Sequence, residues 1–254
     1  MNKLITTLFL CMLIATAIHA SDLTPGDRFA VAIEKGDLDA VKALVAGGSK
    51  ADTLIEYGEH KITPLMKACW DGEQEIAAYL LDQGANINAA DDQGATPLSN
   101  AVSREQVEIV QFLVDKGVKV NIRDIREFTP AVQAAAAGNV EIVKILAKAG
   151  ADLTAETMGL TPLMFAVSAG KEDMVRTLVD LGAPVNQSPK KMNAGSTALF
   201  SAIYAGKPDM VKLLIDLKAN VNVRTKDGDT PLKAAQKGDQ TDIIEMLKAA
   251  GAKQ

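Results

Sequence analysis

The side chains that most often carry out catalysis or bind metals are scarce in this sequence. Its 254 residues include two histidines and two cysteines. His19 and Cys11 fall among the first twenty residues, a distinct segment treated below, which leaves His60 and Cys69. One histidine cannot supply a paired-histidine metal motif, and it leaves room for at most one Ser–His or Cys–His partnership. The composition therefore argues against most metalloenzymes and nucleophilic hydrolases.

The other motifs that could do chemistry have structural explanations. The Asp-Gly-Asp run at 227–229 resembles part of a calcium loop but lacks the remaining ligands, and the Asp-Asp-Gln-Gly run at 91–94 consists of turn formers. Cys69 is expected to be an inert buried thiol on a helix, and His60 to lie on an exposed loop. No glycine-rich phosphate loop, HExxH motif or nucleophile elbow occurs. The sequence predicts a protein without enzyme activity, cofactor, catalytic residue or bound metal.

A short phrase recurs six times and predicts the elements that hold these residues. Its threonines lie 33, 33, 32, 36 and 33 positions apart. Thr can cap a helix N-terminus, Pro fits the first helical position, and Leu begins a buried stripe, so each phrase predicts a helix start. The six phrases are Thr63-Pro64-Leu65, Thr96-Pro97-Leu98, Thr129-Pro130-Ala131, Thr161-Pro162-Leu163, Thr197-Ala198-Leu199 and Thr230-Pro231-Leu232.

A second helix is predicted in each unit by an apolar stripe thirteen, fourteen, seventeen and eighteen residues after the threonine. Ile109, Val110, Leu113 and Val114 are one example, and this spacing places all four on one helical face. Two such helices cannot bury their apolar faces alone, so neighbouring units must stack. Glycines suited to a left-handed helix end follow the second helix at Gly84, Gly117, Gly150, Gly182 and Gly251, and Lys218 stands at this position in one unit.

Two terminal units complete the stack. The stretch from Asp27 and Arg28 to Gly48 fits the same template, with Asp27 and Arg28 in place of Thr and Pro, and is interpreted as the N-terminal cap. In the last unit Lys248 replaces an apolar residue, as expected of a terminal face that meets water.

The phased phrases resemble the ankyrin-repeat family, over about seven units from Asp27 to Ala252. The resemblance implies an all-α solenoid of helix-turn-helix units with short β-hairpin fingers that project from one side. It also implies a protein-binding role without catalysis. The family's histidine after Thr-Pro-Leu is absent in all six phrases. The expected units are 22–55 (N-terminal cap), 56–88, 89–121, 122–153, 154–186, 187–222 and 223–254 (C-terminal cap).

The first twenty residues, 1–20, are expected to be a cleaved export signal. Met1-Asn2-Lys3 gives a basic start, an apolar run follows from Leu4 to Ile18, and Ala20 is small enough for a signal peptidase. A retained membrane anchor is the alternative. We expect the mature protein, 21–254, to be periplasmic, with secretion as the alternative, and without further membrane attachment.

The charge of the predicted mature chain disfavours nucleic acid as a partner. Removal of Lys3 leaves 27 − 1 = 26 basic and 32 acidic residues, a net charge of about −6. An acidic chain without a basic stripe lacks the electrostatic footprint that phosphate backbones require. We expect a monomer that binds another protein.

Seven residues are the predicted partner-binding positions. They fall where this architecture exposes variable side chains, on the fingers just before each Thr and near the end of each first helix. Large apolar or aromatic residues on such surfaces are typical of interaction sites. Phe128 and Leu160, each directly before its threonine, could instead tuck into the next unit. The seven positions are Trp70, Ile125, Arg126, Phe128, Met158, Leu160 and Tyr204.

Three classes of function remain. The first is a periplasmic protein that binds and inhibits an exported enzyme, such as a cell-wall hydrolase, to protect the producing cell. The second is a secreted effector that binds a host protein, or a periplasmic scaffold in stress protection. The third, an enzyme, is disfavoured by the scarcity of histidine and cysteine.

Overall fold

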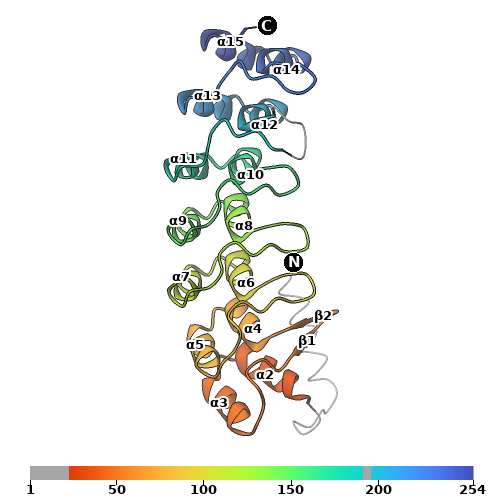
Figure 1. Ribbon diagram of the computed structural model, residues 1–254, viewed down its shortest axis with the longest axis vertical. Coiled ribbons are helices and arrows are strands. Elements are labelled where there is room, and N and C mark those ends of the chain that lie inside the picture. Colours follow the sequence, from red (N-terminus) through yellow and green to blue (C-terminus); the bar gives the residue numbers. More distant parts are fainter. Residues whose placement is uncertain (1–22, 191–195, 254) are drawn as a thin grey trace.

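The computed structural model describes residues 23–190 and 196–253 (Figure 1). This part of the chain contains fourteen α-helices and a two-stranded sheet. The predicted export signal lies outside the described residues. The helices are α2 (Pro25–Glu34), α3 (Leu38–Ala46), α4 (Pro64–Asp71), α5 (Gln74–Asp82), α6 (Pro97–Ser103), α7 (Val107–Asp115), α8 (Pro130–Ala137), α9 (Val140–Lys148), α10 (Pro162–Ala169), α11 (Glu172–Asp180), α12 (Ala198–Tyr204), α13 (Pro208–Asp216), α14 (Pro231–Lys237) and α15 (Thr241–Ala249).

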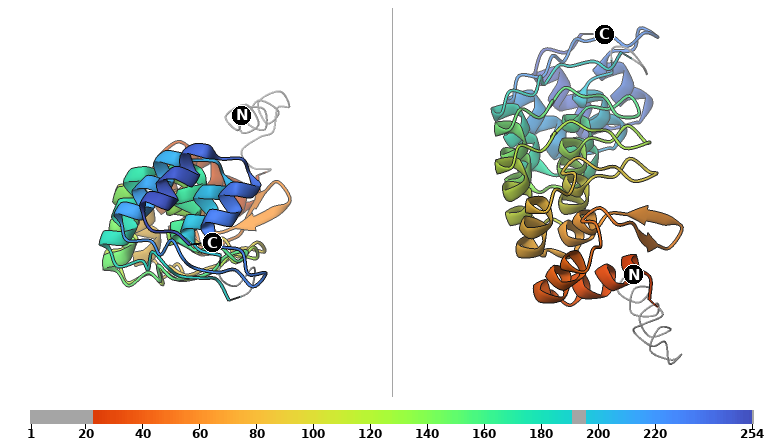
Figure 2. Two further views of the ribbon diagram at one scale, coloured as in Figure 1. Left: turned by 90° about the horizontal axis from the view of Figure 1, so that it is seen from above. Right: turned by 60° about the horizontal axis from the view of Figure 1, so that its bottom comes forward.

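The helices pair and the pairs stack, which confirms the predicted all-α solenoid. Figure 1 shows an inner column (α4, α6, α8, α10, α12, α14) beside an outer column (α5, α7, α9, α11, α13, α15), with α2 and α3 at one end. The loops that connect one pair to the next all project to the same side, as the view along the stack in Figure 2 shows. One helix pair lies within each of the seven residue ranges given above.

The recurring threonine caps five of the six inner helices as predicted, whereas Thr197, at the start of α12, makes no side-chain cap hydrogen bond. Thr63 Oγ1 accepts a hydrogen bond from the Met66 N–H at 3.2 Å, and Pro64 occupies the first turn. This satisfies one of the N–H groups that a helix start leaves without an intrahelical partner. The same bond forms at Thr96, Thr129, Thr161 and Thr230.

The first helix begins earlier than predicted. Asp27 was expected to cap it, but α2 begins at Pro25 with Thr24 as its N-cap, and Asp27 lies inside the helix. The Asp27 N–H donates to Thr24 Oγ1, and the Asp27 carboxylate accepts from the Thr24 N–H, both at 3.1 Å. The additional turn packs on the chain before the first finger: a Cβ on Gly26 would lie 2.2 Å from the Leu54 carbonyl oxygen.

The core lies between and within the helix pairs. On α7, Ile109, Val110 and Leu113 are at most 2% exposed, and the fourth position, Val114, is half-buried. The equivalent side chains of α9, α11 and α13 are buried in the same way. Lys248 on α15 is exposed, as predicted for the end of the stack. Each fully buried aliphatic side chain stabilises the stack by about 1.5–3 kcal/mol.

The first finger is a hairpin of two strands, and the fingers at 91–95, 124–128, 157–160 and 225–229 are turns. Strands β1 (Ile55–Tyr57) and β2 (His60–Ile62) pair antiparallel, with Ile55 opposite Ile62. In the fifth unit, one isolated bridge joins Thr157 to Leu160.

Asparagines after the outer helices link the units through polar contacts. Each Oδ1 accepts a hydrogen bond from a backbone N–H of the following unit, at 2.7–2.9 Å. The buried apolar contacts are therefore supplemented by an oriented polar contact that fixes one unit relative to the next. The pairs are Asn88 with Lys119, Asn121 with Asp152, Asn186 with Asn220 and Asn222 with Lys253.

Candidate partner-binding surface

The fingers and the ends of the inner helices form one surface, which we call the finger face. The Phe128 ring, at the base of one finger, lies 5.5 Å from the Phe165 ring on inner helix α10. At the end of the stack, Asp229 before α14 forms an ion pair with Lys237 at the end of that helix. Side chains from fingers and inner helices thus face one another along the stack.

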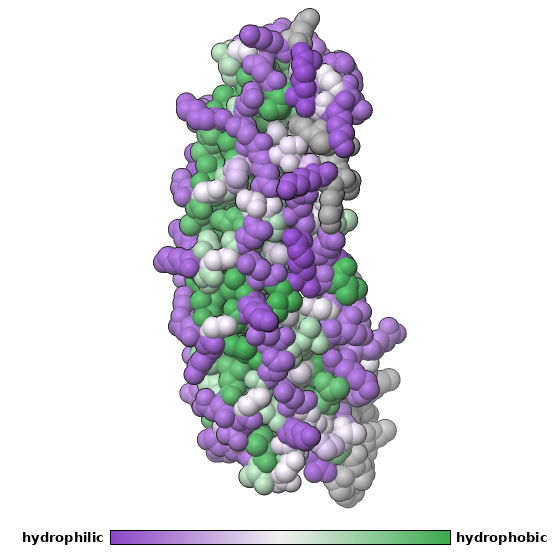
Figure 3. Space-filling view, in the orientation of Figure 1, coloured by the Kyte–Doolittle hydropathy of each residue, from purple (hydrophilic) through white to green (hydrophobic). Residues whose placement is uncertain are grey.

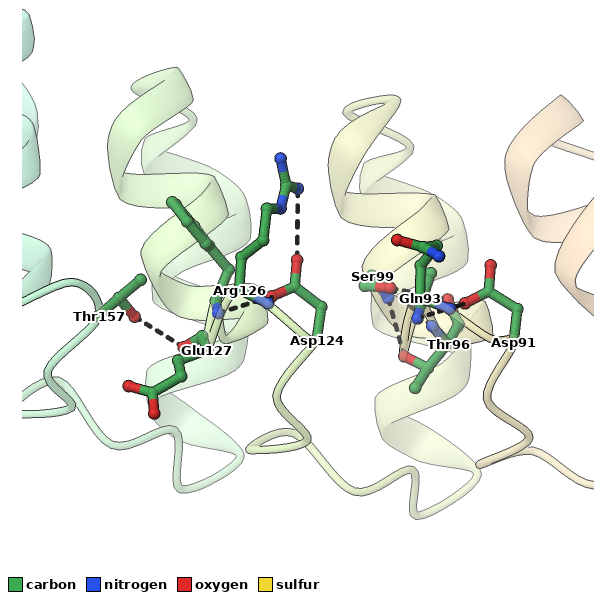
Figure 4. Close-up of polar contacts among 10 residues, drawn as sticks. Asp91, Gln93, Thr96, Ser99, Asp124, Arg126, Glu127 and Thr157 are labelled. Carbon is green, nitrogen blue, oxygen red and sulfur yellow. Dashed lines mark hydrogen bonds and ion pairs between the residues drawn. The ribbon is translucent and has the colours of Figure 1, made fainter. Parts of the chain in front are cut away.

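Exposed and half-buried polar contacts hold the finger turns in shape. Asp91 Oδ1 accepts from the Gln93 and Ala95 N–H groups at 2.9 and 2.8 Å. Asp124 Oδ1 does the same for Arg126 and Phe128, also at 2.9 and 2.8 Å (Figure 4). Each aspartate side chain stands in for a backbone acceptor, which is why aspartate favours such turns.

Hydrogen bonds also join one finger to the next. The Ile125 N–H donates to the Gln93 carbonyl at 3.0 Å. Thr157 Oγ1 donates to the Glu127 carbonyl at 2.8 Å, as Figure 4 shows. These bonds fix the backbone of the fingers near residues 91–95, 124–128 and 157–160, from which the exposed side chains project.

Ile125 and Met158 project from neighbouring fingers. Their side chains are 64% and 65% exposed. In the part of the chain that the structure describes, two other large apolar or aromatic residues are comparably exposed, Leu54 at 52% and Tyr204 at 63%. The finger side of the surface in Figure 3 is otherwise mostly hydrophilic, with isolated apolar patches. Three of the seven predicted positions are therefore exposed apolar or aromatic side chains.

Phe128 and Leu160 are half-buried. Phe128 contacts Phe165 of the next unit, and the Arg126 guanidinium lies 5.3 Å from the Phe128 ring centroid. Leu160 packs against the core. Their placement matches the alternative in which these two residues pack into the stack. Arg126, on the same finger as Phe128, is exposed.

Trp70 and Tyr204 occupy equivalent positions, each the seventh residue after its threonine, but three units lie between them. Trp70 is half-buried, and the Arg104 guanidinium carbon lies 4.5 Å from its ring centroid. Tyr204 is exposed, with its ring 5.8 Å from that of Phe200. The seven predicted residues form a central group on two fingers, with Trp70 and Tyr204 toward opposite ends of the stack.

An open hollow of about 430 Å³ lies beside Trp70. The ends of α4 and α6 and the turn after α6 form it. Its lining residues are Trp70, Asp71, Ser103, Arg104, Glu105 and Gln106.

The residues that could do chemistry are structural here. Cys69 is fully buried, and this burial raises the pKa of its thiol far above its usual range. His60 Nδ1 lies 2.9 Å from Asp92 Oδ1, a contact between two fingers. Asp229 at the calcium-like run pairs with Lys233 at 2.7 Å and with Lys237. Within residues 23–190 and 196–253, no three His, Cys, Asp or Glu side chains gather closely enough to hold a metal.

None of the helices in residues 23–190 and 196–253 is long and apolar enough to cross a bilayer.

Sequence reasoning did not foresee several contacts between units. The stacking of Arg104 on Trp70 and the pairing of His60 with Asp92 join residues 34 and 32 positions apart. The 33-residue period gives a signal for such pairs, because residues one period apart lie side by side in a stack. The side-chain conformations that decide whether they touch have no sequence signal.

The paired, stacked helices and the fingers that join them define a helical-repeat protein. The chain belongs to the ankyrin-repeat family. A match to that family, described as ankyrin repeats in three copies, covers residues 29–124, 123–189 and 186–254. Ankyrin repeats are protein–protein interaction modules, and members of the family are typically not enzymes.

Individual relatives match over about a quarter of the chain. Protein phosphatase 1 regulatory subunit 27 of Mus musculus is 43% identical over 63 residues, which is 25% of this chain and 39% of that protein. Myotrophin of Xenopus tropicalis is 40% identical over 62 residues, 24% of this chain and 50% of its own length. A putative ankyrin repeat protein of Rickettsia bellii is 38% identical over 68 residues, which is 26% of this chain and 10% of that protein. The matches thus span half or less of each relative.

One solved structure matches more broadly. An ankyrin repeat domain from Acinetobacter baumannii AYE superposes with a TM-score of 0.68 at 33% sequence identity. The match covers 75% of this chain and 98% of that domain.

Proposed function

We propose that this chain binds another protein through the finger face, with Ile125 and Met158 as the apolar centre of the contact. The exposure of these two side chains on neighbouring, hydrogen-bonded fingers carries the proposal. Large exposed apolar groups on a soluble surface are typical of interaction sites, and a preorganised surface loses less entropy on binding. Trp70 and Tyr204 extend the contact along the stack.

The specific form of the proposal is inhibition of an exported enzyme, such as a cell-wall hydrolase, in the periplasm. The signal-like pattern of residues 1–20 supports export. Cys69 and His60, the residues that could do chemistry, are held in structural contacts, which supports binding without catalysis. Steric masking of an enzyme requires a broad rigid surface, and a stack of seven units offers one.

The test uses the chain from Ser21 as bait in a periplasmic extract, with mass spectrometry of the bound proteins. The variants are Trp70→Ala with Tyr204→Ala, and Ile125→Ser with Met158→Ser. Leu54→Ser is the matched control, because Leu54 is also exposed but lies outside the proposed contact. The proposal expects one partner to be lost with either double variant and retained with the control. Retention of every partner by all variants would contradict it.

The inhibitory form has its own test. If the partner is a hydrolase, its activity should fall as the chain approaches an equimolar ratio. Undiminished activity in the complex would favour a scaffold, and a partner found only in host extracts would favour an effector. Cell fractionation and N-terminal sequencing of the isolated protein test export directly.

A further inference from the structure

Two arginines of this chain lie over aromatic rings in different electrostatic settings. The Arg126 guanidinium carbon is 5.3 Å from the Phe128 ring centroid, and Arg104 is 4.5 Å from that of Trp70. Arg126 has a carboxylate partner: its Nη2 lies 3.3 Å from Asp124 Oδ2 (Figure 4). This arrangement of ring, guanidinium and carboxylate combines a cation–π contact with a charge-assisted hydrogen bond.

Arg104 also lies over an aromatic ring, that of Trp70, but has no carboxylate partner. Among residues 23–190 and 196–253, no acidic side chain lies within ion-pair distance of Arg104. The carboxylates that line the same hollow are already engaged. Asp71 pairs with Lys67, and Glu105 Oε2 accepts a hydrogen bond from Asn139 Nδ2 at 3.3 Å.

The hollow beside Arg104 has room for a ligand group. Its volume of about 430 Å³ lies within the range of ligand sites, about 300–1,000 Å³. Besides the guanidinium, its lining includes the Ser103 hydroxyl and the Gln106 amide, both able to donate hydrogen bonds. Asp71 and Glu105 line the hollow as well, so it has no net positive charge, and its preference for an anion rests on the Arg104 guanidinium, whose planar fork has no ion-pair partner among the described residues and matches a carboxylate.

We propose that this hollow binds a carboxylate from an acidic segment of the protein partner. Arg104 binds the carboxylate, and Trp70 holds the guanidinium in place. The inference rests on the proposed protein-binding function and names the chemistry of one end of the contact. The ligand thereby completes at Arg104 the arrangement that Asp124 completes within the chain at Arg126.

Trp70 makes the site directly observable, because it is the single tryptophan of the chain. Its fluorescence is followed while the chain from Ser21 is titrated, at constant ionic strength, with acetyl-Ala-Glu-Ala-amide. The matched probe is acetyl-Ala-Gln-Ala-amide, which has no carboxylate. A third peptide, acetyl-Ala-Ala-Ala with a free carboxyl terminus, separates a chain-terminal carboxylate from a side-chain one.

The expected result is a saturable change in Trp70 emission with the glutamate peptide and none with the glutamine peptide. Arg104→Gln should weaken binding by about tenfold or more, and Arg104→Lys should give an intermediate loss because it keeps the charge without the planar fork. Arg176→Gln, at an exposed arginine on outer helix α11, is the control and should bind as the unaltered chain does. Circular dichroism and thermal unfolding confirm that each variant is folded.

Two results would overturn the inference: equal responses to the glutamate and glutamine peptides, including no response to either, or binding that survives Arg104→Gln. These outcomes are separable from failure of the proposed function. A protein partner whose capture is insensitive to Arg104→Gln would leave the proposed function standing and remove the inference. Specific carboxylate binding without any protein partner would remove the proposed function and leave the site.

Discussion

Thr154 and Pro184 stand where the neighbouring units have an asparagine and a backbone N–H. Thr154 is the fourth residue after Gly150, the position held by Asn88, Asn121, Asn186 and Asn222 after their own helix ends. Pro184 is the second residue after Gly182. At the equivalent position, two residues after the helix end, the other units have a backbone N–H that donates to the asparagine of the preceding unit. Proline has no N–H, so an acceptor at position 154 would have no donor to bind. Thr154 Oγ1 donates instead to Asp152 Oδ1, at 2.6 Å.

The two positions should therefore be energetically coupled. Pro184→Ala alone should destabilise the chain by about 0.4–1 kcal/mol, because the proline restricts the unfolded state. Thr154→Asn alone should gain nothing. The double variant restores both donor and acceptor, so we expect a favourable coupling free energy of about 1 kcal/mol. Urea unfolding of the unaltered chain, the two single variants and the double variant measures this coupling free energy. Strict additivity of the two single effects would contradict the relationship.

Lys218→Gly should raise the melting temperature. Lys218 has φ = 67°, in the left-handed region, at the position that Gly84, Gly117, Gly150 and Gly182 hold elsewhere. A side chain at that conformation costs roughly 0.5–1 kcal/mol, which corresponds to a rise of about 1–4 °C. Gly150→Lys is the reciprocal variant, since a Cβ on Gly150 would meet nothing within 4 Å. It should lower the melting temperature by a similar amount, and a rise with Gly150→Lys would refute the argument.

Most of the fold could be predicted from the sequence because the repeat supplies six independent copies of one signal. Each Thr-Pro phrase predicted a helix start, and the glycine or lysine after each outer helix predicted a left-handed residue. The error at Asp27 has a local cause. The alignment of Asp27 and Arg28 with Thr-Pro assumes an inner helix of standard length, whereas Thr24 and Pro25 provide a cap and a first turn three residues earlier.

The candidate site was less predictable because exposure depends on neighbours in space. Ile125 and Phe128 lie on the same finger, yet Phe165 of the next unit covers Phe128 and leaves Ile125 exposed. The residue that contacts Phe128 is 37 positions away. Such a contact depends on side-chain rotamers and on the offset between units, which a period in the sequence does not specify.

Thr197→Val should cost little stability, in contrast to the same change at Thr161. Both threonines are 2% exposed and stand at the start of an inner helix. Thr161 Oγ1 accepts from the Met164 N–H at 3.3 Å, whereas Thr197 Oγ1 has no hydrogen-bond partner among the described residues. Loss of a threonine N-cap costs about 0.5–2 kcal/mol, so Thr161→Val should fall in that range.

For Thr197→Val the expected change is within about 0.5 kcal/mol, because valine keeps the shape and removes an unsatisfied hydroxyl. Denaturant unfolding of the two variants measures the contrast. Equal losses at both positions would show that the Thr197 hydroxyl has a partner in solution.

Cys69 should make the folded state less stable at alkaline pH. Burial raises the pKa of its thiol in the folded state, so the unfolded chain loses this proton first as pH rises. The contribution of the protonated thiol is complete below the unfolded pKa of about 8.5 and declines above it, by at most about 1.4 kcal/mol per pH unit. Cys69→Ala, which keeps a small apolar side chain, should remove this part of the pH dependence. Urea unfolding of both chains, lacking residues 1–20, at pH 7 and about pH 9.5 tests the prediction. Parallel losses in the two chains would mean that the thiol ionises within the folded stack, which its full burial between helices opposes.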